Sequence, residues 1–167
     1  DQSAKFYQID LRRGYPQVGE PDFSQPLCLL VDNSLASLQK IAAFWRDQLN
    51  VEVIGITGSV GKSTTKEMVA SILHRSWKIL KNQGTFNNLV GFPITLLQLT
   101  NTHQAAVVEL GMNQPGEIRR LTEIVSPDVG LVTNIQPAHL QGLGSLEGIQ
   151  AAKGELFAGM DASATIV

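Results

Sequence analysis

The chain has 167 residues, of which 43% are hydrophobic and 17% are charged, and its formal net charge is −2. This composition is typical of a globular domain with a buried core and excludes an intrinsically disordered chain. The small net charge gives no general electrostatic basis for binding nucleic acid or an anionic membrane surface, and no apolar run approaches the roughly 20 residues that span a bilayer.

The first 26 residues contain several glycines and prolines and no hydrophobic period, so we expect a loop there. The apolar stretch 27–31 predicts a strand, and a four-turn helix is predicted from the spacing of Leu35, Leu38, Ala42, Trp45 and Leu49. Apolar stretches typical of strands then alternate with helical stretches. The strands are expected at 51–57, 77–80, 105–110 and 129–135, and the helices at 63–75, 91–99, 116–125 and 145–158.

This alternation favours an α/β fold with a mostly parallel sheet and helices on both faces. We expect a domain boundary near residue 50, where the first helix ends. The chain starts at Asp1 without a methionine and stops in the apolar stretch ATIV, so we expect a fragment of a longer protein. The single cysteine, Cys28, cannot form an internal disulfide, and no signal peptide is visible, which favours the cytoplasm.

The sequence GSVGKS, residues 58–63, follows a predicted strand and precedes a predicted helix. Its glycines allow a tight turn in which successive N–H groups point at one anion, and the start of the helix adds further N–H groups. Lys62 would contact the β- and γ-phosphates, and the Ser63 hydroxyl would bind Mg²⁺. The predicted phosphate-binding residues are Gly58, Ser59, Val60, Gly61, Lys62, Ser63 and Thr64.

The loop is shorter than the usual pattern, which has a first glycine where this chain has Ile56. A glycine-rich turn with a solvated lysine is therefore the simpler alternative. The position between a strand and a helix favours the phosphate site.

Two further polar residues follow predicted strands. Glu109 ends the stretch AAVVE, and His139 lies in a loop after the next strand. Because the carboxyl ends of parallel strands meet at one edge, both residues should lie near the phosphate loop, and the Glu109 carboxylate is a candidate ligand for the metal of a nucleotide. A solvated glutamate and a surface histidine are the simpler alternatives for each residue alone.

Lys153 shares one face of a predicted helix with apolar residues, among them Ile149 and Leu156. The lysine could extend its charge to water. If instead it is desolvated, its pKa falls and a neutral amine becomes available, which can add CO₂ to form a carbamate. Two adjacent amides, Asn87 and Asn88, join a strand to a helix, where they either form a turn or bind a polar substrate.

Five motifs in this order resemble the Mur ligase family, the ATP-dependent amide-forming enzymes of bacterial cell-wall synthesis. The motifs are TGSVGKSTTKEM, FNNLVGFPITLL, VVELGMNQPGEI, VTNIQPAHLQGLGS and AAKGELF, which together cover about residues 50–160. The second and third motifs are most similar to the member that adds D-alanyl-D-alanine to a UDP-linked muramoyl tripeptide. Residues 1–26 match no motif of the family.

The resemblance implies that residues 50–167 are the first part of a central ATP-binding domain of the phosphate-loop type. Residues 1–49 would be the end of an N-terminal UDP-substrate domain with its junction helix, and the C-terminal domain would lie outside the chain. It also implies ATP and Mg²⁺ as cofactors, a cytoplasmic monomer, and an acyl phosphate intermediate that is attacked by the amine of D-alanyl-D-alanine.

The resemblance further implies roles for individual residues. Lys62, His139 and Lys153 would be catalytic, with Lys153 carbamylated, and the metal would be bound by Ser63, Glu109 and His139. Asn87 and Asn88 would contact the UDP-linked substrate.

Three alternatives remain open. A sibling ligase would differ only in its amino-acid substrate, and a non-catalytic module would bind nucleotide alone. A regulatory ATPase or GTPase would hydrolyse nucleotide without an acyl acceptor, but it would leave Lys153 and the paired asparagines unexplained.

Overall fold

The computed structural model describes residues 7–12, 14, 24–84, 86–137 and 145–167. The chain divides into two compact units, residues 1–38 and residues 39–167. The boundary predicted near residue 50 remains a prediction about the domains of the longer protein. Within the described ranges, none of the helices has the length and apolarity needed to cross a membrane.

The first unit contains a two-stranded parallel sheet, β1 (Tyr7–Asp10) and β2 (Leu27–Leu30), in which Tyr7 lies opposite Leu27. The expectation that residues 1–26 form only a loop is wrong for β1. Its sequence, YQID, has no strong strand pattern, and the strand exists because a partner strand far along the chain supplies its hydrogen bonds. The strand predicted at 27–31 is confirmed by β2.

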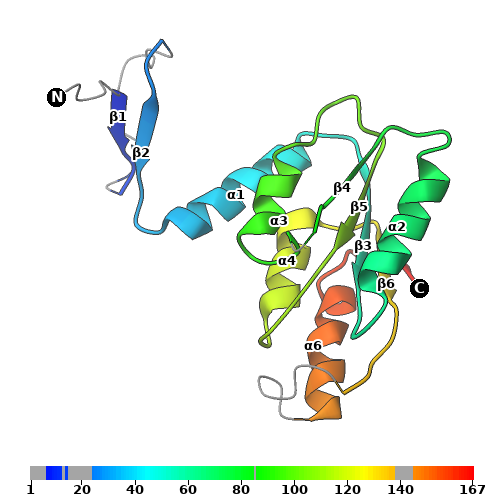
Figure 1. Cartoon of the computed structure of the whole chain (residues 1–167). Helices are drawn as coiled ribbons and strands as arrows, with labels where there is room; N and C mark the ends of the chain where they lie inside the picture. Colours follow the sequence, from blue (N-terminus) through cyan, green and yellow to red (C-terminus); the bar gives the residue numbers. More distant parts are fainter. Residues whose placement is uncertain (1–6, 13, 15–23, 85, 138–144) are drawn as a thin grey trace. The chain divides into compact units, whose positions relative to one another are not determined.

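The second unit is built on a five-stranded sheet in which every neighbouring pair is parallel, with the order β4-β5-β3-β6-β7 (Figure 1). Its strands are β3 (Glu52–Thr57), β4 (Ile79–Lys81), β5 (Ala105–Glu109), β6 (Val129–Val132) and β7 (Thr165–Ile166). The helices are α1 (Ser34–Asp47), which begins in the first unit, α2 (Lys62–Leu73), α3 (Gly91–Leu96), α4 (Glu117–Val125) and α6 (Leu146–Ala158). Each predicted strand and helix is present, with ends shifted by a few residues.

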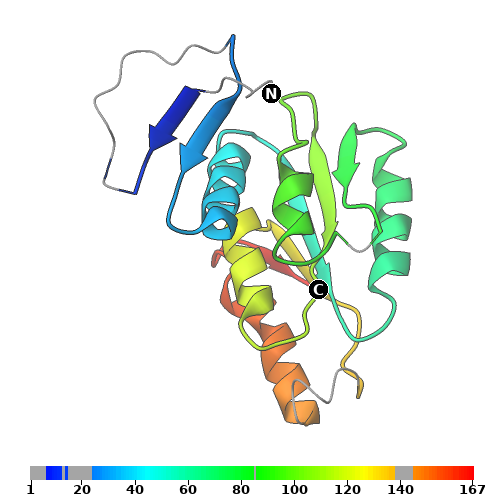
Figure 2. The ribbon, with the colours of Figure 1, turned by 60° about the vertical axis from the view of Figure 1, so that its left-hand side comes forward.

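Helices cover both faces of this sheet, as the sequence predicted. Figure 1 and Figure 2 show α2 on one face and α3, α4 and α6 on the other. The residues of the strands alternate between the two faces. Val53, Ala106 and Val108 pack with Phe92 and Leu121 in the larger core, whereas Ile56 and Val107 pack against α2.

Because the strands are parallel, the segments after β3, β5 and β6 all leave from the same edge of the sheet. This edge carries the glycine-rich loop, the end of β5 and the segment that follows β6. The opposite, amino-terminal edge is where β3, β6 and β7 begin.

Candidate functional site

The glycine-rich loop joins β3 to α2 through two residues with positive φ, Gly58 at 149° and Gly61 at 85°. A Cβ on Gly58 would lie 1.9 Å from Thr133 Oγ1, so only glycine fits there. Gly61 immediately precedes α2, and no described side chain caps that helix. Its first N–H groups and its positive dipole end are therefore suited to bind an anion.

The segment after β6 holds the loop in place. The Asn134 side chain accepts a hydrogen bond from Val60 N and donates one to Val60 O, at 3.0 and 2.9 Å. Thr133 Oγ1 also donates to Val60 O, and Ser59 N donates to Asn134 O. These hydrogen bonds fix the conformation of the loop before any ligand is considered, and the sequence did not indicate this role for Thr133 or Asn134.

Lys62 and Ser63 begin α2. Lys62 Nζ donates to Gly58 O at 3.0 Å, and the side chain lines a hollow of about 290 Å³. The same hollow is lined by Asn87, Asn88, Glu109, Gly111, Met112, Asn113 and Glu117. Thr64 is exposed and, together with Ser63, lines a separate surface of α2.

Glu109 ends β5, as predicted, and its carboxylate meets the phosphate loop. Ser63 Oγ donates to Glu109 Oε2 at 2.6 Å, and Asn87 Nδ2 donates to Glu109 Oε1 at 2.8 Å. Glu109 is only 3% exposed. A Cβ on Gly111 would lie 2.7 Å from the Asn87 side chain, so a glycine is needed for the amide to reach the carboxylate.

The paired asparagines have different surroundings. Asn87 bonds to Glu109, whereas Asn88 Oδ1 accepts hydrogen bonds from Val90 N and Gly91 N at the start of α3. Both residues line the hollow, so either remains a candidate for contact with a substrate.

Lys153 lies on α6, which packs against α4, β3 and β6. The lysine is 3% exposed, and none of the ion pairs among the described residues includes it. Burial, and secondarily the charge of Lys62, lowers the pKa of Lys153 to about 8. The predicted desolvation is therefore present, and the charge of Lys62, in the phosphate loop, acts on the Lys153 amine.

The donor atoms at this edge are suited to Mg²⁺. Ser63 and Glu109 offer a hydroxyl and a carboxylate, and hard oxygen ligands of this kind suit a cation that keeps several waters and binds phosphates. Within the described residues, no group of three or more histidine, cysteine, aspartate or glutamate side chains could hold a metal alone. His139, the other predicted metal ligand, lies outside the described residues.

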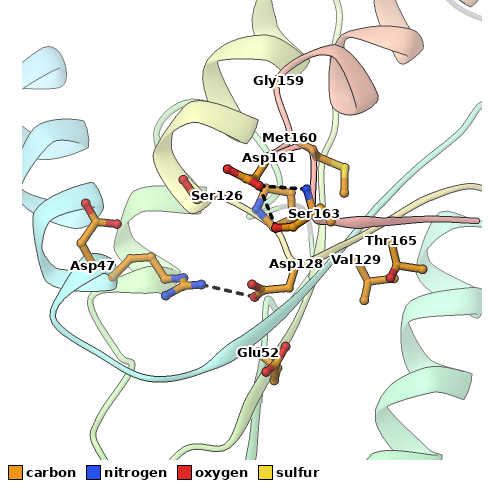
Figure 3. A pocket seen from close by; sticks show the side chains of 13 residues that line it. Asp47, Glu52, Ser126, Asp128, Val129, Gly159, Met160, Asp161, Ser163 and Thr165 are labelled. Carbon is orange, nitrogen blue, oxygen red and sulfur yellow. Dashed lines mark hydrogen bonds and ion pairs between the residues drawn. The ribbon is translucent and has the colours of Figure 1, made fainter.

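A larger hollow, of about 810 Å³, lies at the amino-terminal edge of the sheet (Figure 3). Its lining includes Glu52 and Asp128, close to the starts of β3 and β6, and Arg46, whose guanidinium pairs with Asp128. No residue of the phosphate loop lines it. The larger hollow and the predicted phosphate loop therefore lie at opposite edges of the sheet.

Comparisons with known proteins agree with this fold. A family model described as the Mur ligase middle domain matches residues 56–167. The UDP-N-acetylmuramoyl-tripeptide–D-alanyl-D-alanine ligase of Haemophilus influenzae is 45% identical over 136 residues, which are 79% of this chain and 30% of that protein.

Solved structures give the same result. The crystal structure of MurF from Acinetobacter baumannii matches with a TM-score of 0.81 and 40% identity, over 88% of this chain and 33% of that one. MurF ligase from Thermotoga maritima, solved in complex with ADP, has a TM-score of 0.79 and 30% identity over 93% of this chain and 37% of that one. The chain thus spans about a third of the length of the relatives it matches.

Proposed function

Because the chain belongs to the Mur ligase family, we propose that the full-length protein is an ATP-dependent ligase that adds D-alanyl-D-alanine to a UDP-N-acetylmuramoyl tripeptide. The similarity to several ligases with this substrate, at 40% identity or more, supports the choice of member. The proposal concerns the full-length protein, which we place in the cytoplasm in peptidoglycan synthesis and expect to be a monomer.

The observation that carries the proposal is the 2.6 Å contact between Ser63 and Glu109. It joins the start of the phosphate-binding helix to the end of the neighbouring strand, and Glu109 lines the same hollow as Lys62. We propose that Lys62 contacts the β- and γ-phosphates of ATP, while the loop N–H groups hold the phosphate oxygens. Residues 58–64 are the proposed nucleotide-binding segment.

In the proposed reaction, a carboxylate oxygen of the tripeptide attacks the γ-phosphorus and ADP leaves, which gives an acyl phosphate. The neutral amine of D-alanyl-D-alanine then attacks the acyl carbon. Phosphate leaves, the nitrogen loses a proton and the amide remains. Since the first step brings two anions together, cations must offset their repulsion. Lys62 supplies one such charge at the phosphates.

We propose that Ser63, Glu109 and His139 hold Mg²⁺, which when bound would neutralise charge on the phosphate oxygens. Asn87 holds the Glu109 carboxylate through Oε1 and leaves Oε2 facing Ser63. Asn87 and Asn88 remain the proposed contacts to the UDP-linked substrate, on the evidence that both line the hollow.

Lys153 is proposed to be carbamylated. Its lowered pKa makes the neutral amine accessible near neutral pH, and the amine nitrogen can bond to the carbon of CO₂ with loss of a proton. The product carries a negative charge where an ammonium would repel a metal ion.

The test is whether the full-length protein turns over ATP only when both substrates are present. We expect phosphate release to require the UDP-linked tripeptide and D-alanyl-D-alanine together. ATP hydrolysis at the same rate without either substrate would overturn the proposal in favour of a regulatory ATPase. Activity with the UDP-linked peptide and a different amino acid, but not with D-alanyl-D-alanine, would indicate a sibling ligase.

A further inference from the structure

Asn82 follows the last residue of β4 and has a fully buried side chain, although the proposed function gives it no role. Burying an amide is costly unless its polar atoms are hydrogen bonded. Here Oδ1 accepts from Glu109 N at 2.9 Å, and Nδ2 donates to Glu109 O and to Phe86 O, each at 3.1 Å. Two of the three bonds therefore go to the backbone of one residue, Glu109.

The sheet register explains why Glu109 needs this partner. The pairing of β4 with β5 ends where Lys81 lies opposite Val107, so Glu109 extends two residues beyond that pairing. In a parallel sheet, the N–H and C=O of one residue bond to the same neighbouring strand. The Asn82 side chain takes both of these groups at Glu109, in place of the backbone that β4 no longer provides.

The third hydrogen bond of Asn82 goes to the segment that holds the Glu109 carboxylate. Its acceptor, Phe86 O, belongs to the residue next to Asn87, and Asn87 Nδ2 donates to Glu109 Oε1. One buried amide thus anchors both the backbone of Glu109 and the segment that holds its carboxylate.

Asn82 is in turn tied to the phosphate-binding helix. Lys66, which lies three residues after Ser63 on α2 and is 3% exposed, donates from Nζ to Asn82 O at 2.7 Å. Helix α2 is therefore hydrogen bonded to Glu109 by two routes, directly from Ser63 and indirectly from Lys66 through Asn82.

From this geometry we propose that Asn82 is a positioning residue, which fixes Glu109 so that its carboxylate and the Ser63 hydroxyl stay in place to hold the metal of a magnesium nucleotide. The inference rests on the proposed function. Partners that orient a metal ligand typically change metal affinity about 10- to 100-fold when they are removed. A merely structural amide would change stability without a selective change in the effect of magnesium.

The experiment measures the affinity of the full-length protein for ADP with Mg²⁺ and, separately, with a chelator. The dissociation constant measured with chelator, divided by the one measured with Mg²⁺, gives the factor by which the metal strengthens ADP binding. For Asn82→Ala we expect this ratio to fall about tenfold. The affinity without metal should stay within about twofold of wild type, because the loop N–H groups and Lys62 are untouched. Asn82→Ser replaces the amide with a smaller polar group, a hydroxyl. This variant should fold more readily than Asn82→Ala and show a ratio between those of Asn82→Ala and wild type.

Thr122→Ala is the matched control. Thr122 is also fully buried, but its hydroxyl bonds to Ile118 O within α4 and not to Glu109. This variant should melt at a lower temperature and keep the wild-type ratio.

Folded Asn82 variants with a wild-type ratio would overturn the proposal, and so would an equal fall of the ratio in Thr122→Ala. Failure of both Asn82 variants to fold would assign Asn82 to stability alone and overturn it as well. Absence of magnesium-dependent ADP binding in the wild type would instead overturn the proposed function on which the inference rests.

Discussion

At the amino-terminal edge of the sheet, the Asp128 carboxylate accepts a hydrogen bond from Val53 N at 2.7 Å and pairs with Arg46 at 3.4 Å. At the carboxyl-terminal edge, the Glu109 carboxylate is bonded by the neutral side chains of Ser63 and Asn87. None of the ion pairs among the described residues includes Glu109. The charge of Asp128 is thus already compensated, whereas that of Glu109 remains available to a cation.

The cations of the two edges differ in the same way. The Arg46 guanidinium pairs with Asp128 and donates to the carbonyl oxygen of Val125, where α4 ends. Lys62 and Lys153 form no ion pair among the described residues, and the charge of Lys62 helps to lower the pKa of Lys153. Compensated charges stabilise a fold, whereas uncompensated charges are typical of a site that binds and transforms a charged ligand. This difference supports the proposal that the nucleotide binds at the smaller hollow.

The largest expected effect is that of Lys62→Ala, which removes a charge from the carboxyl-terminal edge. In the full-length protein, ATP turnover with both substrates should fall by about 1,000-fold, because the lysine offsets charge that develops at the phosphates. The melting temperature should change little, since Lys62 contributes little packing. Near-normal turnover in a rate assay would contradict the assignment of the phosphate loop.

Glu109→Gln tests the uncompensated carboxylate directly. The amide keeps the shape of the side chain but removes the negative charge. Turnover should therefore fall roughly 100-fold, and the magnesium concentration that gives the half-maximal rate should rise. A magnesium titration of the initial rate checks this. An unchanged titration curve would show that the charge of Glu109 does not serve a metal.

Lys153→Ala should lower turnover by about tenfold or more, because the proposed carbamate is lost. A small carboxylate such as acetate should restore part of the rate by occupying the vacated space. Lys153→Glu should retain more activity than Lys153→Arg, since it keeps the sign of the charge. If arginine served as well as lysine, Lys153 would be a simple cation and the carbamate would be ruled out.

Asp128→Asn makes the corresponding change at the amino-terminal edge. Loss of a charged acceptor for Val53 N and Arg46 should cost about 2 kcal/mol of stability. Turnover at a temperature where the variant is folded should equal that of wild type. A clear loss of activity at that temperature would show that Asp128 also serves the reaction, so the two edges would not differ in function.

Sequence reasoning reached much of this arrangement because it depends on regular patterns. Alternating apolar and helical stretches predicted the parallel sheet, and strand ends at one edge predicted that Glu109 would meet Ser63. The helical period of α6 predicted the burial of Lys153. These inferences need only local periodicity and the rule that parallel strands end together.

Features that depend on long-range pairing were not predictable in this way. β1 is a strand only because β2 lies beside it, and its sequence was interpreted as a loop. Asn82 and Asn134 are ordinary turn residues in the sequence, and their roles appear only when the sheet order brings Glu109 and Val60 next to them. Asn88 looked equivalent to Asn87, yet its oxygen bonds to the start of α3.

The last expected effect concerns the pH dependence of stability and the uncompensated cation Lys153. Its pKa is lowered to about 8 from an ordinary value of 10.5, so between these two pH values the unfolded chain binds more protons than the folded one. The free energy of unfolding should therefore rise with pH across this window, by at most about 1.4 kcal/mol per pH unit, and the stabilisation should be lost again as the pH falls through 8. Lys153→Met removes this proton linkage, so the variant should be more stable than wild type at pH 7 and gain less from the change to pH 10. Urea midpoints of both proteins at the two pH values check this, in buffers free of CO₂ because carbamate formation would remove the same proton. Parallel pH profiles for the two proteins would mean that the amine keeps its charge at little cost, as the paired Arg46 does at the opposite edge.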